Sequence, residues 1–100
     1  MSNTTSNKRK LPAGRFQLGE LFITPMAKEL LSQLEVSLML SRHAQGDWGI
    51  CCASDCQANE SALKNEARII SCYKSKGGEK VWIITEADRS ATTVLLPSDY

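Results

Sequence analysis

The chain has 100 residues, 42% of them hydrophobic, and its 12 Lys and Arg against 11 Asp and Glu give a net charge of +1. This length suits one small domain, and a charge so near neutral argues against a protein held to nucleic acid mainly by phosphate contacts. The apolar runs are too short to span a bilayer and no signal-peptide pattern stands at the start, so we expect a cytoplasmic protein without a membrane partner. In the reducing cytoplasm the four cysteines should stay as free thiols.

The first part of the chain predicts an arm followed by a strand. Residues 1–15 are polar and basic and predict a disordered arm, whose basic run at residues 8–10 could touch nucleic acid. A single domain is expected over residues 16–100. Residues 16–23 alternate imperfectly between apolar and polar side chains, which predicts a short strand with a bulge at Gly19.

Two helical patterns follow. Thr24 before Pro25 is a favourable helix start, since Pro needs no hydrogen bond at the first helical position. Apolar residues then recur at threes and fours over residues 26–43, either as one helix or as two helices with a break near residues 33–37. After the turn at residues 46–49, Ser54 or Asp55 could cap a second helical pattern of about three turns.

The last third of the chain is rich in strand-forming residues. Residues 68–73 and 81–85 flank a Gly-Gly turn and predict a hairpin, and residues 92–96 predict a further strand that ends at Pro97. The sequence therefore predicts an α+β domain in the order β-α-α-β-β-β, with three or four antiparallel strands and two or three helices packed on one face. The core candidates are Trp82, Ile84, Ile69 and Leu95, and Trp48 is expected to pack against the sheet.

His43 is the only histidine and stands on the last turn of the first helical pattern. A structural role fits this place, because the helix dipole favours a cation at the C-terminus. The alternative is a general acid or base oriented by Asp47, with Glu60, Glu86 or Asp88 as the second group.

The four cysteines give no clear site. His43, Cys51, Cys52 and Cys56 provide enough zinc ligands, but their spacing does not match a zinc knuckle, and no basic neighbour lowers a thiol pKa. We expect these cysteines and Cys72 to fill small apolar spaces. Walker, Rossmann and methyl-donor motifs are absent from the sequence, so no cofactor or metal is predicted.

The densest polar stretch is TEADRSATT, residues 85–93. Glu86 as a base and Arg89 as an anion-stabilising group could bind or cleave a phosphodiester. The alternative is a hairpin loop in which Glu86 or Asp88 pairs with Arg89.

Residues 46–49, 59–73 and 81–100, which read GDWG, NESALKNEARIISCY and VWIITEADRSATTVLLPSDY, carry a resemblance to a known family. They resemble a family of small uncharacterised proteins carried by bacterial plasmids, integrative elements and phages, some of them labelled as type I restriction methylation subunits. This chain departs from the family where Gly49 to Cys52 replace an acidic continuation. The resemblance implies a polar site at His43, Asp47, Trp48, Asn59, Arg68, Tyr73, Glu86, Asp88, Arg89, Thr92 and Thr93.

Three functions follow as hypotheses. The first is an accessory protein of a mobile element that contacts a host or element-encoded protein, such as a nuclease or defence complex. The second is a small ribonuclease, because the element order resembles that of barnase and RelE toxins; His43, Glu86 and Arg89 would then be catalytic. The third is nucleic-acid binding through the basic arm.

Overall fold

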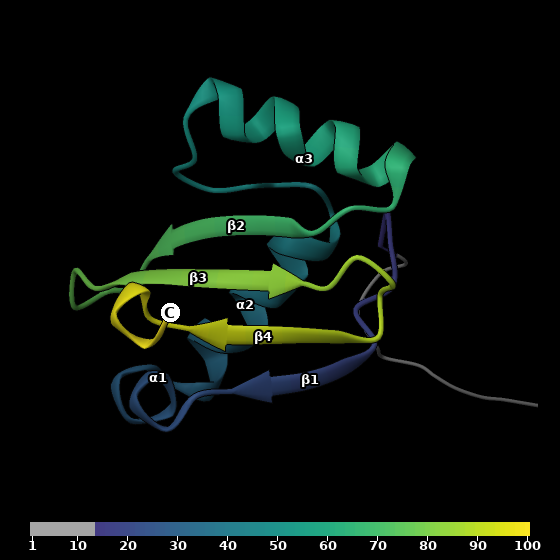
Figure 1. Ribbon diagram of the computed structural model, residues 1–100. Coiled ribbons are helices and arrows are strands. Elements are labelled where there is room, and N and C mark those ends of the chain that lie inside the picture. The colour runs from purple at the N-terminus through teal and green to yellow at the C-terminus, as the bar shows by residue number, and fades with distance from the viewer. Residues whose placement is uncertain (1–13) are drawn as a thin grey trace, which may run out of the picture.

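Four strands form one sheet in the order β1-β4-β3-β2 in the computed structural model, which describes residues 14–100 (Figure 1). β1 (Glu20–Ile23) lies parallel to β4 (Ala91–Leu95), whereas β3 (Lys80–Thr85) is antiparallel to β4 and to β2 (Ile69–Lys74). The predicted α+β class and element order are confirmed, but the purely antiparallel sheet is wrong. β1 pairs with the last strand rather than with a sequence neighbour, so no tight turn sets its direction.

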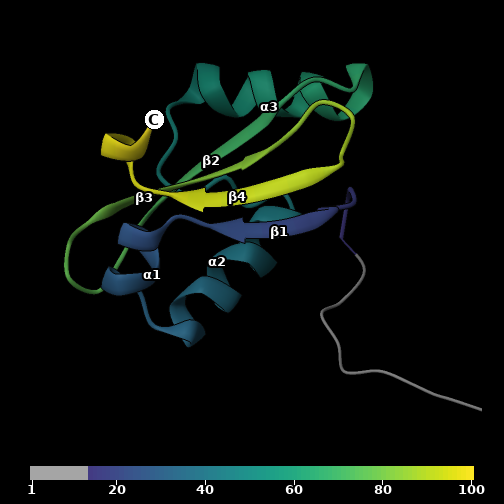
Figure 2. The same ribbon diagram turned by 60° about the horizontal axis from the view of Figure 1, so that its bottom comes forward.

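The helices lie on different sides of this sheet. α1 (Pro25–Leu30) and α2 (Gln33–Ala44) cover one face, behind the sheet in Figure 1 and below it in Figure 2. α3 (Ala53–Asn65) instead runs along the outer edge of β2. Packing on one face is therefore correct for α1 and α2 and wrong for α3. The other face of the sheet carries a short 3-10 helix, η2 (Pro97–Asp99), near β3.

Local capping explains where the helices begin. Thr24 accepts a hydrogen bond from the Ala27 N–H and Pro25 opens α1, as predicted. The first helical pattern then breaks at Ser32, slightly before the expected position. Ser32 and Glu35 form a reciprocal capping box that satisfies the first free N–H groups of α2. α3 begins after Cys52, which makes no side-chain cap, rather than after Ser54 or Asp55.

The strand and arm predictions differ from the structure in detail. The first strand occupies only residues 20–23, and Gly19 precedes it with a φ of 67° instead of forming a bulge within it. Most of the predicted arm, residues 1–15, lies outside the described residues. Arg15 at its end donates its backbone N–H to the Ala44 carbonyl oxygen and pairs with Glu60 at 2.9 Å.

The main core fills the space between the sheet and the helices α1 and α2. It includes Ala27, Leu31, Met39, Leu40, Tyr73, Val81, Ile83, Val94 and Leu96. Of the predicted core residues, Ile69, Ile84 and Leu95 are buried, but Trp82 is only half-buried. Trp82 shares the opposite face of the sheet with Ile70 and Cys72, and α1 and α2 do not cover that face.

The outer edge of β2 is closed by hydrogen bonds. The Asn59 amide group of α3 donates to the Ile70 carbonyl oxygen at 2.8 Å and accepts from the Ile70 N–H at 3.1 Å. Cys72 donates its N–H to Trp48 and accepts from the Ile50 N–H at 2.7 Å. The Asn59 side-chain amide thus bonds to β2 as the backbone of a further strand would, and it holds α3 beside the sheet. No helix in the described part of the chain has the length and apolar character needed to cross a membrane.

Candidate functional site

His43 lies between α2 and the sheet, where it begins a chain of hydroxyl groups. Its side chain is 0% exposed. Nδ1 is bonded to the Ser71 hydroxyl, and Nε2 lies 2.8 Å from Thr85 Oγ1. Thr85 Oγ1 is 2.7 Å from Thr92 Oγ1, which donates to the Leu18 carbonyl oxygen at 2.7 Å. This buried chain therefore joins the helix, three strands and the segment before β1.

The direction of these bonds fixes the tautomer of His43. Because the Thr92 proton goes to a carbonyl oxygen, Thr92 must accept from Thr85, and Thr85 must then accept from the His43 Nε2–H. Nδ1 is left as the acceptor for Ser71. Burial lowers the pKa of His43 from 6.5 to about 4, so the ring is neutral at pH 7. A general acid or base must reach its substrate, and this buried imidazole has no exposed atom with which to do so.

Asp47 does not orient His43. Its carboxylate accepts two hydrogen bonds from Arg42, at 2.7 and 3.2 Å, and one from the Gly49 N–H. The Arg42 bonds hold the pKa of Asp47 below its usual value. Its backbone carbonyl oxygen accepts from the Tyr73 hydroxyl at 2.6 Å. Asp47 therefore stabilises the turn after α2.

Trp48 and Tyr73 are buried side chains. The Trp48 ring stacks on Phe16 with centroids 6.2 Å apart, and its indole N–H donates to Glu60 at 3.0 Å. Glu60 also holds Arg15, and these bonds lower the Glu60 pKa. Burial raises the pKa of Tyr73, so its hydroxyl stays protonated. Neither aromatic ring offers an open surface for stacking a base.

The polar loop between β3 and β4 spans residues 86–90 and forms a turn. Arg89 has a φ of 62° and donates to the carbonyl oxygens of Ala62 and Ala67 at 3.0 and 2.7 Å, at the C-terminal end of α3. Asp88 accepts from the Ser90 N–H, and hydrogen bonding to the Ser90 side chain and then to its backbone lowers the pKa of Asp88. Neither Glu86 nor Asp88 forms an ion pair with Arg89. Glu86 pairs instead with Arg68 at 3.6 Å.

The sequence-predicted site residues are therefore not brought into one cleft. Four of them are buried: His43, Trp48, Tyr73 and Thr92. Asn59 bonds to the outer edge of β2, and Thr93 is half-buried. Asp47, Asp88 and Arg89 support turns and a helix end. Glu86 and Asp88 line a shallow, open hollow at the loop between β3 and β4. Arg68 and Asn59 line the groove described next.

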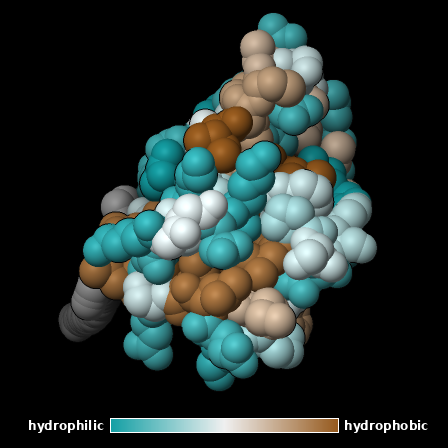
Figure 3. All heavy atoms as spheres, turned by 90° about the vertical axis from the view of Figure 1, so that its left-hand side faces the viewer, coloured by the Kyte–Doolittle hydropathy of each residue, from teal (hydrophilic) through white to brown (hydrophobic). Residues whose placement is uncertain are grey.

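A groove of about 440 Å³ lies between α3 and the face of the sheet that α1 and α2 leave uncovered. Most of its lining is apolar, with a small number of polar groups, as in typical binding pockets. It is lined by Ile50, Cys51, Cys52, Asp55, Ala58, Asn59, Arg68, Ile70, Cys72, Trp82 and Tyr100. Brown apolar atoms also appear in the upper part of Figure 3, beside α3.

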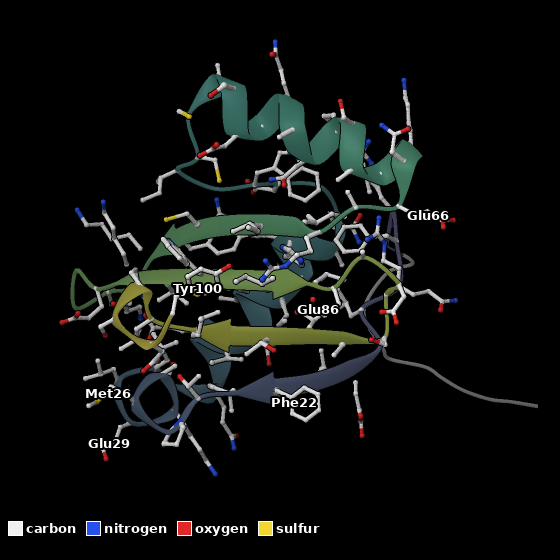
Figure 4. The ribbon with its side chains drawn as sticks, in the orientation of Figure 1. Phe22, Met26, Glu29, Glu66, Glu86 and Tyr100 are labelled. Atoms are coloured by element: carbon white, nitrogen blue, oxygen red, sulfur yellow. The ribbon has the colours of Figure 1, made fainter. Side chains whose placement is uncertain are left out.

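Tyr100, Trp82 and Arg68 form the wall of the groove opposite α3. Tyr100 lies in front of β3, with Glu86 at the far end of the same strand (Figure 4). Its ring meets Trp82 edge-on with centroids 5.5 Å apart, and Arg68 donates to its hydroxyl at 3.1 Å. Arg68 also lies over the ring and pairs with Glu86. Tyr100 is nonetheless 68% exposed, so most of this wall faces solvent.

Cys51 and Cys72 act as apolar groups in the groove. Burial raises the pKa of both Cys51 and Cys72, which keeps these thiols protonated at neutral pH. Cys51 donates to the Trp48 carbonyl oxygen at 3.2 Å. Across residues 14–100, no three His, Cys, Asp or Glu side chains are placed to hold a metal ion. The groove is therefore suited to binding an apolar or aromatic side chain.

The sequence pointed to Arg68 only through the family resemblance and placed Trp82 in the core. Ile50, Ile70 and Tyr100 were not among the predicted site residues. The available signal was the strand pattern of β2: Ile70 and Cys72 alternate with Ile69 and Ser71, so two apolar positions must lie on the face away from the main core.

Comparisons of the chain with models of protein families, with curated proteins and with solved structures find no match. The resemblance to a mobile-element family therefore stays a prediction. The function must be inferred from the geometry of the groove.

Proposed function

We propose that this protein is a non-catalytic accessory protein that binds another protein through the groove beside α3. The observation that carries the proposal is the wall formed by Tyr100, Trp82 and Arg68. Trp, Tyr and Arg are the residues that contribute most to protein interfaces, because they combine large apolar area with directed hydrogen bonds. Ile50 and Ile70 add exposed apolar area to the lining of this groove.

The charges of the groove support binding over catalysis. Arg68 already has the Tyr100 hydroxyl and Glu86 as partners, so its guanidinium is held in place before a partner arrives. The hydrogen bond that Arg68 donates to the Tyr100 hydroxyl contributes most to raising the pKa of Arg68. Burial raises the pKa of the Cys51 and Cys72 thiols in the lining, which keeps them protonated and makes them poor nucleophiles.

The resemblance to proteins of plasmids, integrative elements and phages supports a partner encoded by the host or by the element. A nuclease or a defence complex is such a partner. The ribonuclease alternative would use His43, Glu86 and Arg89, but the first is buried and the third is bonded to α3. Nucleic-acid binding through the arm depends on residues outside the described part of the chain.

Replacing Ile50 by aspartate, or Tyr100 by alanine, is expected to weaken partner capture at least about tenfold, since each removes an exposed apolar anchor. Both side chains are mostly exposed, so the fold should tolerate the changes. The measurement is quantitative affinity capture from host cells, with the partner identified by mass spectrometry and its affinity then measured with purified proteins.

Leu34→Asp is the matched control, because Leu34 is 65% exposed but lies on α2, away from the groove. It should bind the partner as the wild type does. Equal affinity in the wild type and both groove variants would refute the groove as the contact. Cleavage of RNA or DNA by the purified protein, abolished by Glu86→Gln, would instead support the ribonuclease alternative.

A further inference from the structure

Two lysines stand side by side where β2 ends and β3 begins. Lys74 and Lys80 lie opposite each other in the register of these strands, and both are exposed. Residues directly opposite in an antiparallel pair have Cβ atoms about 5 Å apart, and like charges at such positions repel each other. Neither lysine belongs to the ion pairs formed among residues 14–100. The described part of the chain therefore holds two positive charges together and pairs no carboxylate with them.

These lysines extend the groove beside α3. Strand residues two apart share a face of the sheet, so Lys74 lies on the face of Cys72. Lys80 lies on the face of Trp82 in the same way, and Cys72 and Trp82 both line the groove. Burial raises the pKa of the Cys72 thiol, and the positive charge of Lys80 acts on this thiol in the opposite direction, as expected for neighbours. Figure 3 looks onto this end of the sheet, where hydrophilic atoms lie next to apolar ones.

Protection of a sheet edge does not account for both lysines. Lysines at open edges prevent pairing with another chain. The outer edge of β2 is already closed by Asn59 and by the segment at Gly49, and β3 is a central strand with a neighbour on each side. Lys80 on β3 therefore guards no edge, and the two charges beside the groove point to an anionic ligand.

We propose that the groove binds an acidic segment of the partner protein, in which one apolar side chain enters the groove and a nearby carboxylate pairs with Lys74 and Lys80. The inference rests on the proposed function, because it names what the partner presents to the groove. Trp82 and Lys80 are two residues apart, which is about 7 Å along a strand. An extended partner segment therefore contacts both when its Asp or Glu lies two or three positions from its apolar anchor.

The charges around the groove favour an acidic protein segment over nucleic acid. The cations outnumber the carboxylates, with Arg68, Lys74 and Lys80 against Asp55 and Glu86, and Arg68 already holds Glu86. Asp55 lines the groove from α3, where it would repel a phosphate backbone, and two lysines neutralise about two phosphates, too few for tight binding. A protein segment gains most of its affinity from the apolar anchor, and the lysines add specificity and a faster association rate.

Selection of a display library of random peptides against the full chain tests this composition. Enriched peptides should carry an aromatic or aliphatic residue with Asp or Glu two or three positions away, and Tyr100→Ala should abolish their enrichment. Peptides that depend on Tyr100 but carry no excess of Asp and Glu would overturn the acidic segment and leave the groove as the contact. No enrichment, or enrichment that Tyr100→Ala leaves unchanged, would overturn both proposals.

Fluorescence polarisation with the most enriched peptide then tests the charges one by one. Lys80→Glu should raise the Kd of the peptide at least about fivefold, because an attractive charge becomes a repulsive one. Asp55→Asn should lower the Kd, because it removes a carboxylate that repels the acidic peptide. Lys28→Glu is the matched control, with the same change of charge on an exposed lysine of α1 across the sheet. It should leave the Kd within about twofold, because salt screens a distant charge.

Lys74→Glu separates recognition from folding. It places a carboxylate opposite Lys80, so the midpoint of thermal unfolding should rise while the Kd of the peptide increases at least about threefold. Wild-type affinity in both Lys74→Glu and Lys80→Glu, or an equal loss in Lys28→Glu, would overturn the proposal. So would a single-stranded oligonucleotide that binds more tightly than any acidic peptide and is lost in Lys80→Glu, because the lysines would then serve phosphate.

Discussion

His43→Leu is expected to lower the free energy of unfolding by about 3 kcal/mol at pH 7, because it leaves buried hydroxyl groups without partners. Ser71 would lose the acceptor for its proton, and Thr85 would lose its donor. Both hydroxyls are fully buried, so water cannot replace the imidazole without entering the core. Urea unfolding followed by circular dichroism measures the change.

A double variant separates lost packing from the unsatisfied hydroxyl. In the His43→Leu background, Ser71→Ala should recover about 1 kcal/mol, since it removes the donor that has lost its acceptor. The same Ser71→Ala change in the wild type should destabilise the fold instead. A His43→Leu variant as stable as the wild type would contradict the hydrogen-bond chain.

His43 should also make the free energy of unfolding depend on pH. The pKa of His43 is about 4 in the folded chain and near 6.5 when unfolded, so only the unfolded chain binds this proton between those values. The contribution of His43 to the free energy of unfolding is therefore fully present above pH 6.5. It falls by about 3 kcal/mol as the pH is lowered to 4. His43→Leu should lack this slope while keeping that of the carboxylates. Parallel pH profiles for the two proteins would show that His43 does not titrate in this way.

Gly49→Ala is expected to destabilise the fold by at least about 3 kcal/mol. Gly49 has a φ of 79°, and a Cβ there would overlap the Cys72 carbonyl oxygen and lie 2.6 Å from Tyr73 Cδ1. The segment must then move away from β2, which breaks the bond from the Ile50 N–H to Cys72. Because Ile50 and Cys72 both line the groove, partner binding should fall together with stability.

Gly77→Ala is the matched control. A Cβ at Gly77 would meet only Ser75 Oγ, at 3.8 Å, and its φ is not in the left-handed region. Thermal unfolding should give nearly the same midpoint as the wild type. If Gly49→Ala and Gly77→Ala unfolded alike, the close approach of Gly49 to β2 would not matter for stability.

The parts of the fold that depend on neighbouring residues could be predicted from the sequence. Thr24 and Pro25 mark the start of α1 because capping involves only the next helical turn. The turn with Gly78 at a φ of 89° joins β2 to β3, as the hairpin pattern indicated. Ile69 is buried because strand alternation places it on the core face.

The parts that depend on distant contacts could not be predicted. Nothing near β1 in the sequence says that it pairs with β4, so the parallel direction was missed. His43 and Asp47 are close in sequence, but α2 turns one into the core while Arg42 holds the other outside. The groove is assembled from segments as far apart as Ile50 and Tyr100, and only the packing of α3 beside β2 brings them together.

Hydrogen–deuterium exchange of the protein, alone and with its captured partner, tests the central claim most directly. If the groove is the contact, bound partner should slow exchange at residues 50–52, 69–72 and 100 and leave the loop at residues 86–90 unchanged. Slower exchange confined to that loop, with none in the groove, would contradict the account and return the polar loop to consideration as the functional site.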